Sequence, residues 1–290
     1  MKGNLFMYFA DLFNNNNLLQ HFGSYVNKQR NINSDEFLFH ATLLVMSIQK
    51  IHMLNALCLR QMQAAKENLT VKDDKIIVWS PTMVELLTLI PPSLSSLVIM
   101  QNKIFPLLQP VVGFKQSPPS SFRDAVKSIH RYNLPKQVMQ KTLSYWNNGG
   151  LAAREYRDTA EHHYYLLAHS YYQFTPVEKV LIYLPDEPSQ KNYRKYTFDK
   201  KIECIEYLEK SFLTLCQYVD AVLSDLGFAR EAIQQTINQT QIDLEEGVSK
   251  TLGMMFYDTD GQVGLEFGQT EERRLFFKPF NHLKHSAGAP

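Results

Sequence analysis

Apolar residues recur at three- and four-residue steps between Asp199 and Leu226, the clearest periodic pattern in the chain. The members of this stripe are Ile202, Ile205, Leu208, Phe212, Leu215, Val219, Val222 and Leu226. Such spacing places one apolar face along an α-helix. Gly227 follows where a left-handed C-terminal cap is expected. The pattern therefore predicts a long amphipathic helix that ends at this glycine.

The first half of the chain also has a helical pattern. Ser34, followed by two acids, is typical of an N-cap and predicts a helix to about Asn68. Its apolar residues cover more than one face, which favours a central position in a bundle. Pro81 after Ser80 indicates another helix start. We expect that helix to end at Pro91-Pro92 and a further one to cover about 93–108.

The loop QSPPSS at 116–121 is the most plausible internal boundary. Further helices are expected over about 122–132, 135–147, 151–174 and 230–242, and Asn147-Asn148-Gly149-Gly150 is expected to break the chain before the third of these. VEKVLIYLP at 177–185 predicts a short strand, and the alternating runs around Asp260-Gly261 predict a hairpin. The fold class is therefore mainly α, an antiparallel helical bundle with a small C-terminal β-hairpin. We divide it into residues 1–115, 116–250 and 251–290.

Composition gives no sign of a strong electrostatic partner. The 290 residues include 30 basic and 29 acidic side chains, so any contact with nucleic acid must come from a local patch. Cys58, Cys204 and Cys216 fall in apolar helical patterns, which indicates buried, reduced thiols and a cytoplasmic protein. The N-terminal residues show no signal peptide. The uncharged run from Leu86 to Asn102 is interrupted by two prolines, so we expect a buried helical pair and no membrane contact.

The most pointed chemical signal is Arg157-Asp158-Thr159-Ala160-Glu161-His162, inside an expected helix. An arginine can hold a phosphate, and an imidazole that titrates near neutral pH can move a proton. Five helical residues place Arg157 and His162 about 140° apart and ~7.5 Å apart along the axis. Arg154, Asp158 and His162 lie within about 80° of arc, so Asp158 could orient the imidazole.

An arginine, a polar residue, three further residues and a histidine resemble the signature of the HEPN superfamily, helical-bundle proteins that include RNA-cutting toxins and antiviral effectors. Here these positions are Arg157, Asp158 and His162. The preceding glycine pair and the flanking helices are also similar to that family. One position departs from the pattern, because many active members have asparagine where this chain has Asp158.

The resemblance implies a metal-independent endoribonuclease. His162 would accept the proton of a ribose 2′-hydroxyl, and Arg157 would stabilise the charge that develops on the phosphate. It also implies a homodimer with two motifs across one cleft, an RNA substrate, and no cofactor. The resemblance further implies a toxin or an antiviral defence effector, for which an antitoxin or another subunit is a candidate partner.

The same residues also allow structural interpretations. Arg154–Asp158 and Arg157–Glu161 have the spacing of ordinary surface ion pairs, and His162 could serve in packing. Aromatic rings near the motif could stack on bases, but packing is the favoured interpretation; they are Tyr156, Tyr164, Tyr165, Tyr171 and Tyr172. The histidines lack the His-x-x-x-His or Glu-x-x-His spacing of helical metal sites, so no metal is expected.

The segment at 190–201, QKNYRKYTFDKK, interleaves basic and aromatic residues. Lys191, Tyr193, Arg194 and Lys195 are candidate contacts to single-stranded RNA, together with Arg154. A solvated loop is the slightly favoured interpretation of the segment, and RNA binding gains weight only if the segment lies near His162 in space. The function predicted is therefore an HEPN-type ribonuclease. The alternative is a non-catalytic helical binding or scaffold protein in which the motif is a structural ion-pair cluster.

Overall fold

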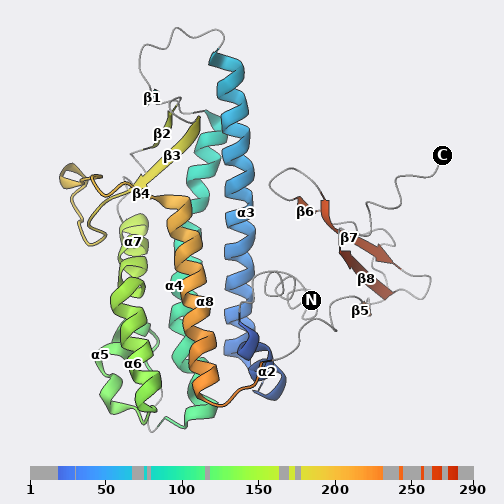
Figure 1. The fold of residues 1–290 in the computed structure, drawn as a ribbon, viewed down its shortest axis with the longest axis vertical. Helices are drawn as coiled ribbons and strands as arrows, with labels where there is room; N and C mark the ends of the chain where they lie inside the picture. The colour runs from blue at the N-terminus through green and yellow to red at the C-terminus, as the bar shows by residue number, and fades with distance from the viewer. Residues whose placement is uncertain are drawn as a thin grey trace.

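The computed structural model describes residues 19–29, 31–66, 75–76, 80–114, 118–162, 170–173, 178–230, 242–243, 256–257, 263–269 and 274–279. The described part of the chain is mainly helical, with small antiparallel sheets. The long helices run side by side along one axis, as Figure 1 shows. Several expectations fall on residues outside these ranges: most of the helix expected over 230–242, the turn Asp260-Gly261, Tyr164 and Tyr165.

Helix α2 covers Gln20–Gln29, and α3 covers Ile32–Lys66. The expected N-cap at Ser34 is wrong, because Asn31 performs that function. The side-chain oxygen of Asn31 accepts hydrogen bonds from the backbone N–H groups of Asn33 at 3.0 Å and Ser34 at 3.1 Å. Ser34 lies inside the first turn, where its hydroxyl donates to the Asn31 carbonyl. Helix α3 packs against α4 and α8. The central position predicted for it is wrong, because several of its large apolar side chains are exposed: Phe39, Leu43, Met46, Met53 and Leu57.

Helix α4 runs without interruption over Pro81–Val112, so the predicted end at Pro91-Pro92 is wrong. The predicted start is confirmed, because the Ser80 hydroxyl accepts from the N–H of Met83 at 3.1 Å. Each internal proline removes a backbone donor, which usually ends a helix. Here α4 packs along α3, and Ile90 and Leu94 on either side of the proline pair are fully buried. The apolar contacts of this continuous face offset the lost hydrogen bonds.

The two short helices expected after the loop are confirmed. They are α5, Phe122–Lys127, extended by a short 3₁₀ turn at Ile129–Arg131, and α6, Lys136–Tyr145. A π-helical segment, Trp146–Gly150, joins α6 to α7, which covers Leu151–His162. The predicted break at the paired asparagines and glycines is confirmed, because the backbone at Gly149 is not helical (φ 172°, ψ −34°) and the chain kinks there between α6 and α7.

The first sheet corrects the expectation of a helix that extends to Phe174. Residues Ser170–Gln173 form strand β2, which pairs with β1, Lys75–Ile76, and with β3, Lys179–Leu184. Tyr171 and Tyr172 point to opposite faces of the strand, and the protein buries both rings, which local helical periodicity could not reveal. The predicted strand at β3 is confirmed. Strand β4, Ile202–Glu203, completes the antiparallel order β1-β2-β3-β4.

The predicted amphipathic helix is confirmed as α8, Cys204–Asp225, followed by Gly227 with a φ of 85°. It begins five residues later than Asp199. The residues from its apolar stripe join one core with residues of α2, α3, α4 and α6. The three cysteines are free and buried, as expected.

The predicted C-terminal hairpin is confirmed by the pairing of β6, Phe256–Tyr257, with β7, Val263–Gln269. It belongs to a larger antiparallel sheet of order β5-β8-β7-β6, in which β8 covers Arg274–Pro279. Ile242 lies in β5, Ile242–Asp243, where the sequence predicted the end of a helix. Its partner Leu275 in β8 is distant in sequence.

Two helical segments are long and apolar enough to cross a membrane by length and composition: Ile32–Ala64 and Pro81–Val112. In their most apolar stretches 39% and 44% of the residues are buried within the protein. Core helices of soluble proteins pass the same test. A cytoplasmic location and the lack of membrane contact therefore remain predictions.

Candidate functional site

A buried polar cluster fixes the start of α7, the helix that carries the motif. The Gln101 side chain on α4 donates to the Tyr145 hydroxyl at 2.7 Å and to the Gly150 carbonyl at 3.1 Å. Tyr145 stacks on Tyr218 of α8, with ring centroids 4.6 Å apart. Burial raises the pKa of Tyr145 above its ordinary value, so the hydroxyl stays neutral and can both accept and donate. Three helices thereby meet where α7 begins.

The buried face of α7 holds the loop at 185–200. The Tyr156 hydroxyl donates to the Pro185 carbonyl at 2.6 Å, and the Thr159 hydroxyl donates to the Pro188 carbonyl at 2.9 Å. Both side chains are buried. Tyr156 thus acts in packing and anchoring, as do the buried rings of Tyr171 and Tyr172 in β2, which confirms the packing interpretation for these three tyrosines.

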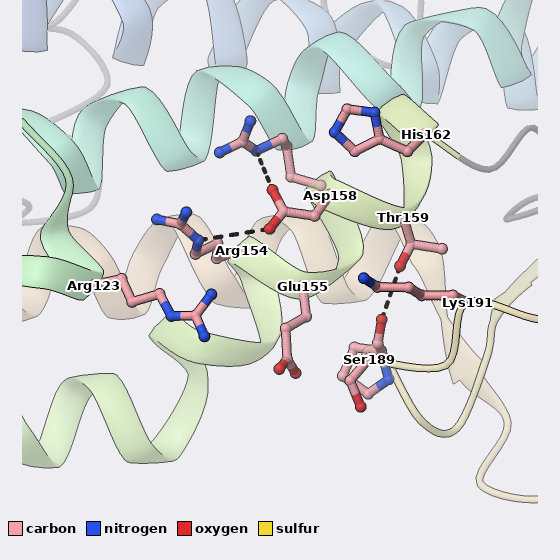
Figure 2. A pocket seen from close by; sticks show the side chains of 10 residues that line it. Arg123, Arg154, Glu155, Asp158, Thr159, His162, Ser189 and Lys191 are labelled. Carbon is pink, nitrogen blue, oxygen red and sulfur yellow. Dashed lines mark hydrogen bonds and ion pairs between the residues drawn. The ribbon is translucent and has the colours of Figure 1, made fainter.

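The exposed face of α7 lines an open pocket of ≈ 680 Å³, shown in Figure 2. Residues from three parts of the chain surround it: α5, α7 and the loop at 185–200. The lining residues are Arg123, Arg154, Glu155, Arg157, Asp158, Thr159, His162, Pro188, Ser189 and Lys191. The motif therefore opens onto a space large enough for a small polyanion, with four basic side chains around it.

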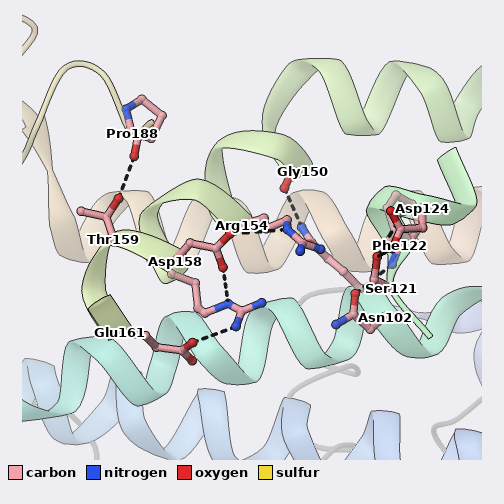
Figure 3. A network of polar contacts seen from close by, with 12 residues as sticks. Asn102, Ser121, Phe122, Asp124, Gly150, Arg154, Asp158, Thr159, Glu161 and Pro188 are labelled. Atoms are coloured by element: carbon pink, nitrogen blue, oxygen red, sulfur yellow. Dashed lines mark hydrogen bonds and ion pairs between the residues drawn. The ribbon is translucent and has the colours of Figure 1, made fainter. Parts of the chain in front are cut away.

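The ion pairs expected from helical spacing are confirmed, and Figure 3 shows the network. Nη1 of Arg157 lies 2.8 Å from Oε2 of Glu161, and Nε of Arg154 lies 3.6 Å from Oδ2 of Asp158. Nε of Arg157 lies 3.2 Å from the other oxygen of Asp158. Asp158 thus bridges two arginines, and no hydrogen bond between Asp158 and His162 occurs among the described residues. Its predicted role in orienting the imidazole has no contact to support it.

Glu161 links the network to α4. The Ser95 hydroxyl donates to Oε1 of Glu161 at 2.8 Å, whereas Arg157 donates to the other carboxylate oxygen, Oε2. Burial acts to raise the pKa of Glu161, but the hydrogen bonds from Arg157 and Ser95 outweigh it and lower the pKa. The carboxylate is therefore ionised at neutral pH. It holds the Arg157 guanidinium in place against the helix.

His162 stands at the C-terminal end of α7 and is exposed at the pocket. Within the part of the chain that the structure describes, its ring has no hydrogen-bond partner. An imidazole in this position is open to a bound molecule. The structural interpretation of His162 as a packing residue is therefore wrong.

The basic segment at 190–201 lies near His162, as its interpretation as an RNA contact requires, because Lys191 lines the same pocket. Tyr193, Arg194 and Lys195 form a 3₁₀ turn just beyond it, and all three are exposed. The Arg194 guanidinium lies 5.8 Å from the centroid of the Tyr193 ring. The structure thus brings one of the four predicted contacts of this segment into the pocket and leaves three on the adjoining surface.

Sequence reasoning missed two charged residues of the pocket, Arg123 and Glu155, and three uncharged ones, Thr159, Pro188 and Ser189. Glu155 is two helical turns from His162, a spacing of seven residues that could have placed it on the same face. Burial raises the pKa of Glu155; Arg123 acts to lower it, and Asp158 and Glu187 act to raise it. Arg123 comes from α5, and no local pattern links it to the motif.

Asp186 fixes the loop that carries Lys191. Its carboxylate accepts from the backbone N–H groups of Asp199 and Lys200, each at 2.9 Å. Burial acts to raise its pKa, but hydrogen bonds from Thr197, Lys200 and Asp199 outweigh it and lower the pKa. Helix α8 begins later than its apolar pattern predicts because Ile202 and Glu203 pair with β3, and Glu203 caps the helix by accepting from the N–H of Glu206 at 2.8 Å.

We expect Asp186→Asn to lower the melting temperature at neutral pH. A carboxylate with a lowered pKa stabilises the fold above the ordinary aspartate pKa, and this contribution disappears as the pH falls through the folded-state pKa. The difference between parent and variant should therefore shrink below about pH 4. Thermal unfolding followed by circular dichroism over pH 3–8 measures it. Asp199→Asn is the control, since it keeps its backbone N–H; equal effects of both variants would contradict the proposed anchor.

The described residues contain no group of three or more histidine, cysteine, aspartate or glutamate side chains arranged to hold a metal ion. No protein-family model, curated protein or solved structure matches the chain. The chemistry of the pocket is thus the basis for a functional proposal, together with the motif resemblance.

Proposed function

We propose that the protein is a metal-independent endoribonuclease of HEPN type, with its site in the pocket on α7. The observation that carries the proposal is that His162 and Arg157 line one open pocket with Arg154 and Lys191. A neutral imidazole and a forked guanidinium are the groups that RNA cleavage by the 2′-hydroxyl requires. A toxin or antiviral role in the cytoplasm, with an antitoxin or partner subunit, is the biological setting that the resemblance suggests.

In the proposed reaction His162 accepts the proton of the ribose 2′-hydroxyl. The 2′-oxygen forms a bond to the adjacent phosphorus while the bond from phosphorus to the 5′-oxygen breaks. The leaving 5′-oxygen takes a proton from solvent water, and the products carry a 2′,3′-cyclic phosphate and a 5′-hydroxyl. Arg157 stabilises the charge on the non-bridging oxygens as the transition state forms.

Arg157 is held in position for this task. Its contacts to Asp158 and Glu161 involve Nε and Nη1. A guanidinium carries five N–H donors, so donors remain for a phosphate. The two carboxylates fix the direction of the side chain, and a bound phosphate competes with them for its charge. Asp158 therefore acts in the proposal as a positioning residue for Arg154 and Arg157.

We expect the purified protein to cut single-stranded RNA in the presence of EDTA. The products should be labelled at the 5′ end by a kinase without prior phosphatase treatment, and they should resist phosphatase at the 3′ end until acid opens the cyclic phosphate. A DNA strand of the same sequence is the control, because it lacks the 2′-hydroxyl and should stay intact. RNA that stays intact under all conditions, or 3′-hydroxyl products, would contradict the proposal.

The proposal includes a homodimer in which two copies of α7 face one cleft, as the resemblance implies. Light scattering of the purified protein measures this directly, and a monomer at working concentrations would remove the dimer from the proposal. The cleavage chemistry of one pocket is a separate question that the RNA assay answers.

A second function has one specific observation in its favour. Arg154 and Arg157 are each paired with carboxylates, as in a structural ion-pair cluster of a binding or scaffold protein. Such pairs on a surface stabilise a fold by about 0–1 kcal/mol. This alternative predicts that Arg157→Ala changes the melting temperature and that no nuclease activity exists to be lost.

A further inference from the structure

The pocket on α7 extends beyond the motif from Arg157 to His162. His162 and Lys191 lie at one end and Arg123 at the other, with Arg154, Glu155 and Asp158 between them (Figure 2). Arg154 and His162, the first and last lining residues of α7, are eight positions apart, so the lined face of α7 extends over ~12 Å. This length exceeds the size of a single phosphate group.

The charges at the two ends differ from those in the middle. Arg154 and Arg157 are paired with Asp158 and Glu161. Among the described residues, neither Arg123 nor Lys191 forms an ion pair with a carboxylate, and the charge of Arg123 acts on Glu155 only strongly enough to oppose the rise in its pKa. The cations with the least internal compensation thus stand at opposite ends of the pocket, on α5 and on the loop at 185–200.

The backbone that carries Arg123 is fixed to the rest of the pocket. The preceding residue, Phe122, is buried, and its N–H donates to the Asn102 side chain of α4 at 2.9 Å (Figure 3). The Phe122 ring contacts Tyr145 edge to face, with centroids 5.8 Å apart. Ser121 caps α5 by accepting from the N–H of Asp124. Arg123 therefore projects from a rigid element beside the start of α7.

We propose that the pocket binds two consecutive phosphates of one RNA strand, with Arg123 as the anchor for the phosphate next to the scissile one. This inference rests on the proposed function, which places the scissile phosphate at Arg157 and His162. The neighbouring phosphate lies at the Arg123 end, where Arg154 is the adjacent cation. Glu155 lies between the ends and is the acidic residue that an incoming strand must pass. The substrate is then an internal stretch of RNA with a phosphate on at least one side of the cut.

Binding to a variant that should not cleave RNA tests this inference. In His162→Ala, a trinucleoside diphosphate should bind roughly tenfold more tightly than a dinucleoside monophosphate, the gain from one charge-assisted contact. Adding Arg123→Gln should remove most of that gain and leave binding of the monophosphate nearly unchanged. The slope of log affinity against log salt for the longer probe should also fall in magnitude by about 0.7, the value for one contact to a single strand.

Arg131→Gln is the matched control, because Arg131 is exposed and does not line the pocket. It should leave both affinities and the salt slope unchanged. Equal affinities for the two probes, an equal loss for both in Arg123→Gln, or no binding of either probe would overturn the inference. If the parent protein cuts RNA but the gain is absent, only the two-phosphate site fails. If the gain is present but RNA is never cut, the site stands as a binding site and the nuclease proposal fails.

Discussion

Replacing His162 with alanine is expected to reduce RNA cleavage at least about 100-fold, since general base catalysis contributes roughly 10²–10⁴ in rate. The side chain is exposed at the pocket and has no hydrogen-bond partner among the described residues, so its removal should leave the melting temperature unchanged. Initial rates on a fluorescent single-stranded RNA in EDTA, with a melting curve of each variant, give both quantities.

His130→Ala is the control for this experiment. His130 is also exposed, but it lies in the 3₁₀ turn after α5 and does not line the pocket. It should cut RNA at the parental rate. Full activity of His162→Ala would show that another group is the base. A fall in activity together with a lower melting temperature would instead indicate a structural role for the imidazole.

Gly150→Ala is expected to destabilise the protein by about 1–3 kcal/mol, the range for an added methyl in a packed core. A Cβ atom at this position would lie 2.8 Å from Cε1 of Tyr145 and 3.3 Å from Cε3 of Trp146. Tyr145 cannot move away easily, because it stacks on Tyr218 and accepts a hydrogen bond from Gln101. Chemical denaturation measures the change in the free energy of unfolding.

Gly149→Ala is the control, because it adds the same methyl group at the adjacent position. A Cβ atom on Gly149 would meet nothing within 4 Å, and the φ of 172° is extended backbone that any residue adopts. Gly149→Ala should therefore be neutral, or stabilising by about 0.4–1 kcal/mol through a less flexible unfolded chain. Equal destabilisation by both substitutions would show that the π-helical segment needs glycine for its backbone, and that contact with Tyr145 is not the cause.

Apart from the N-cap of α3, local patterns predicted well where the stabilising contacts are close in sequence. Ser80 caps α4 through an N–H three residues away, and Gly227 follows α8 in the left-handed conformation. Arg157 and Glu161, which form an ion pair, are one helical turn apart in sequence. Such interactions depend on residues within about four positions, so the sequence itself shows both partners.

Two of the wrong predictions show how distant contacts decide local structure. The proline pair in α4 should end a helix, but burial of Ile90 and Leu94 along α3 keeps it continuous. Tyr171 and Tyr172 continue an apparent helical pattern, but pairing with β3 makes the segment a strand. In both cases the free energy of packing exceeds the local preference of the backbone.

By itself the sequence determined that the protein is mainly helical and that an arginine, an acid and a histidine follow one another on α7. Only the tertiary structure decided which groups share a pocket with them. Lys191 reaches it because Tyr156 and Thr159 bind the carbonyls of Pro185 and Pro188, and Arg123 reaches it because α5 is tied to α4. The physical reason is that helix formation is governed by neighbours along the chain, whereas a binding site depends on contacts between segments far apart in sequence, which no local pattern encodes.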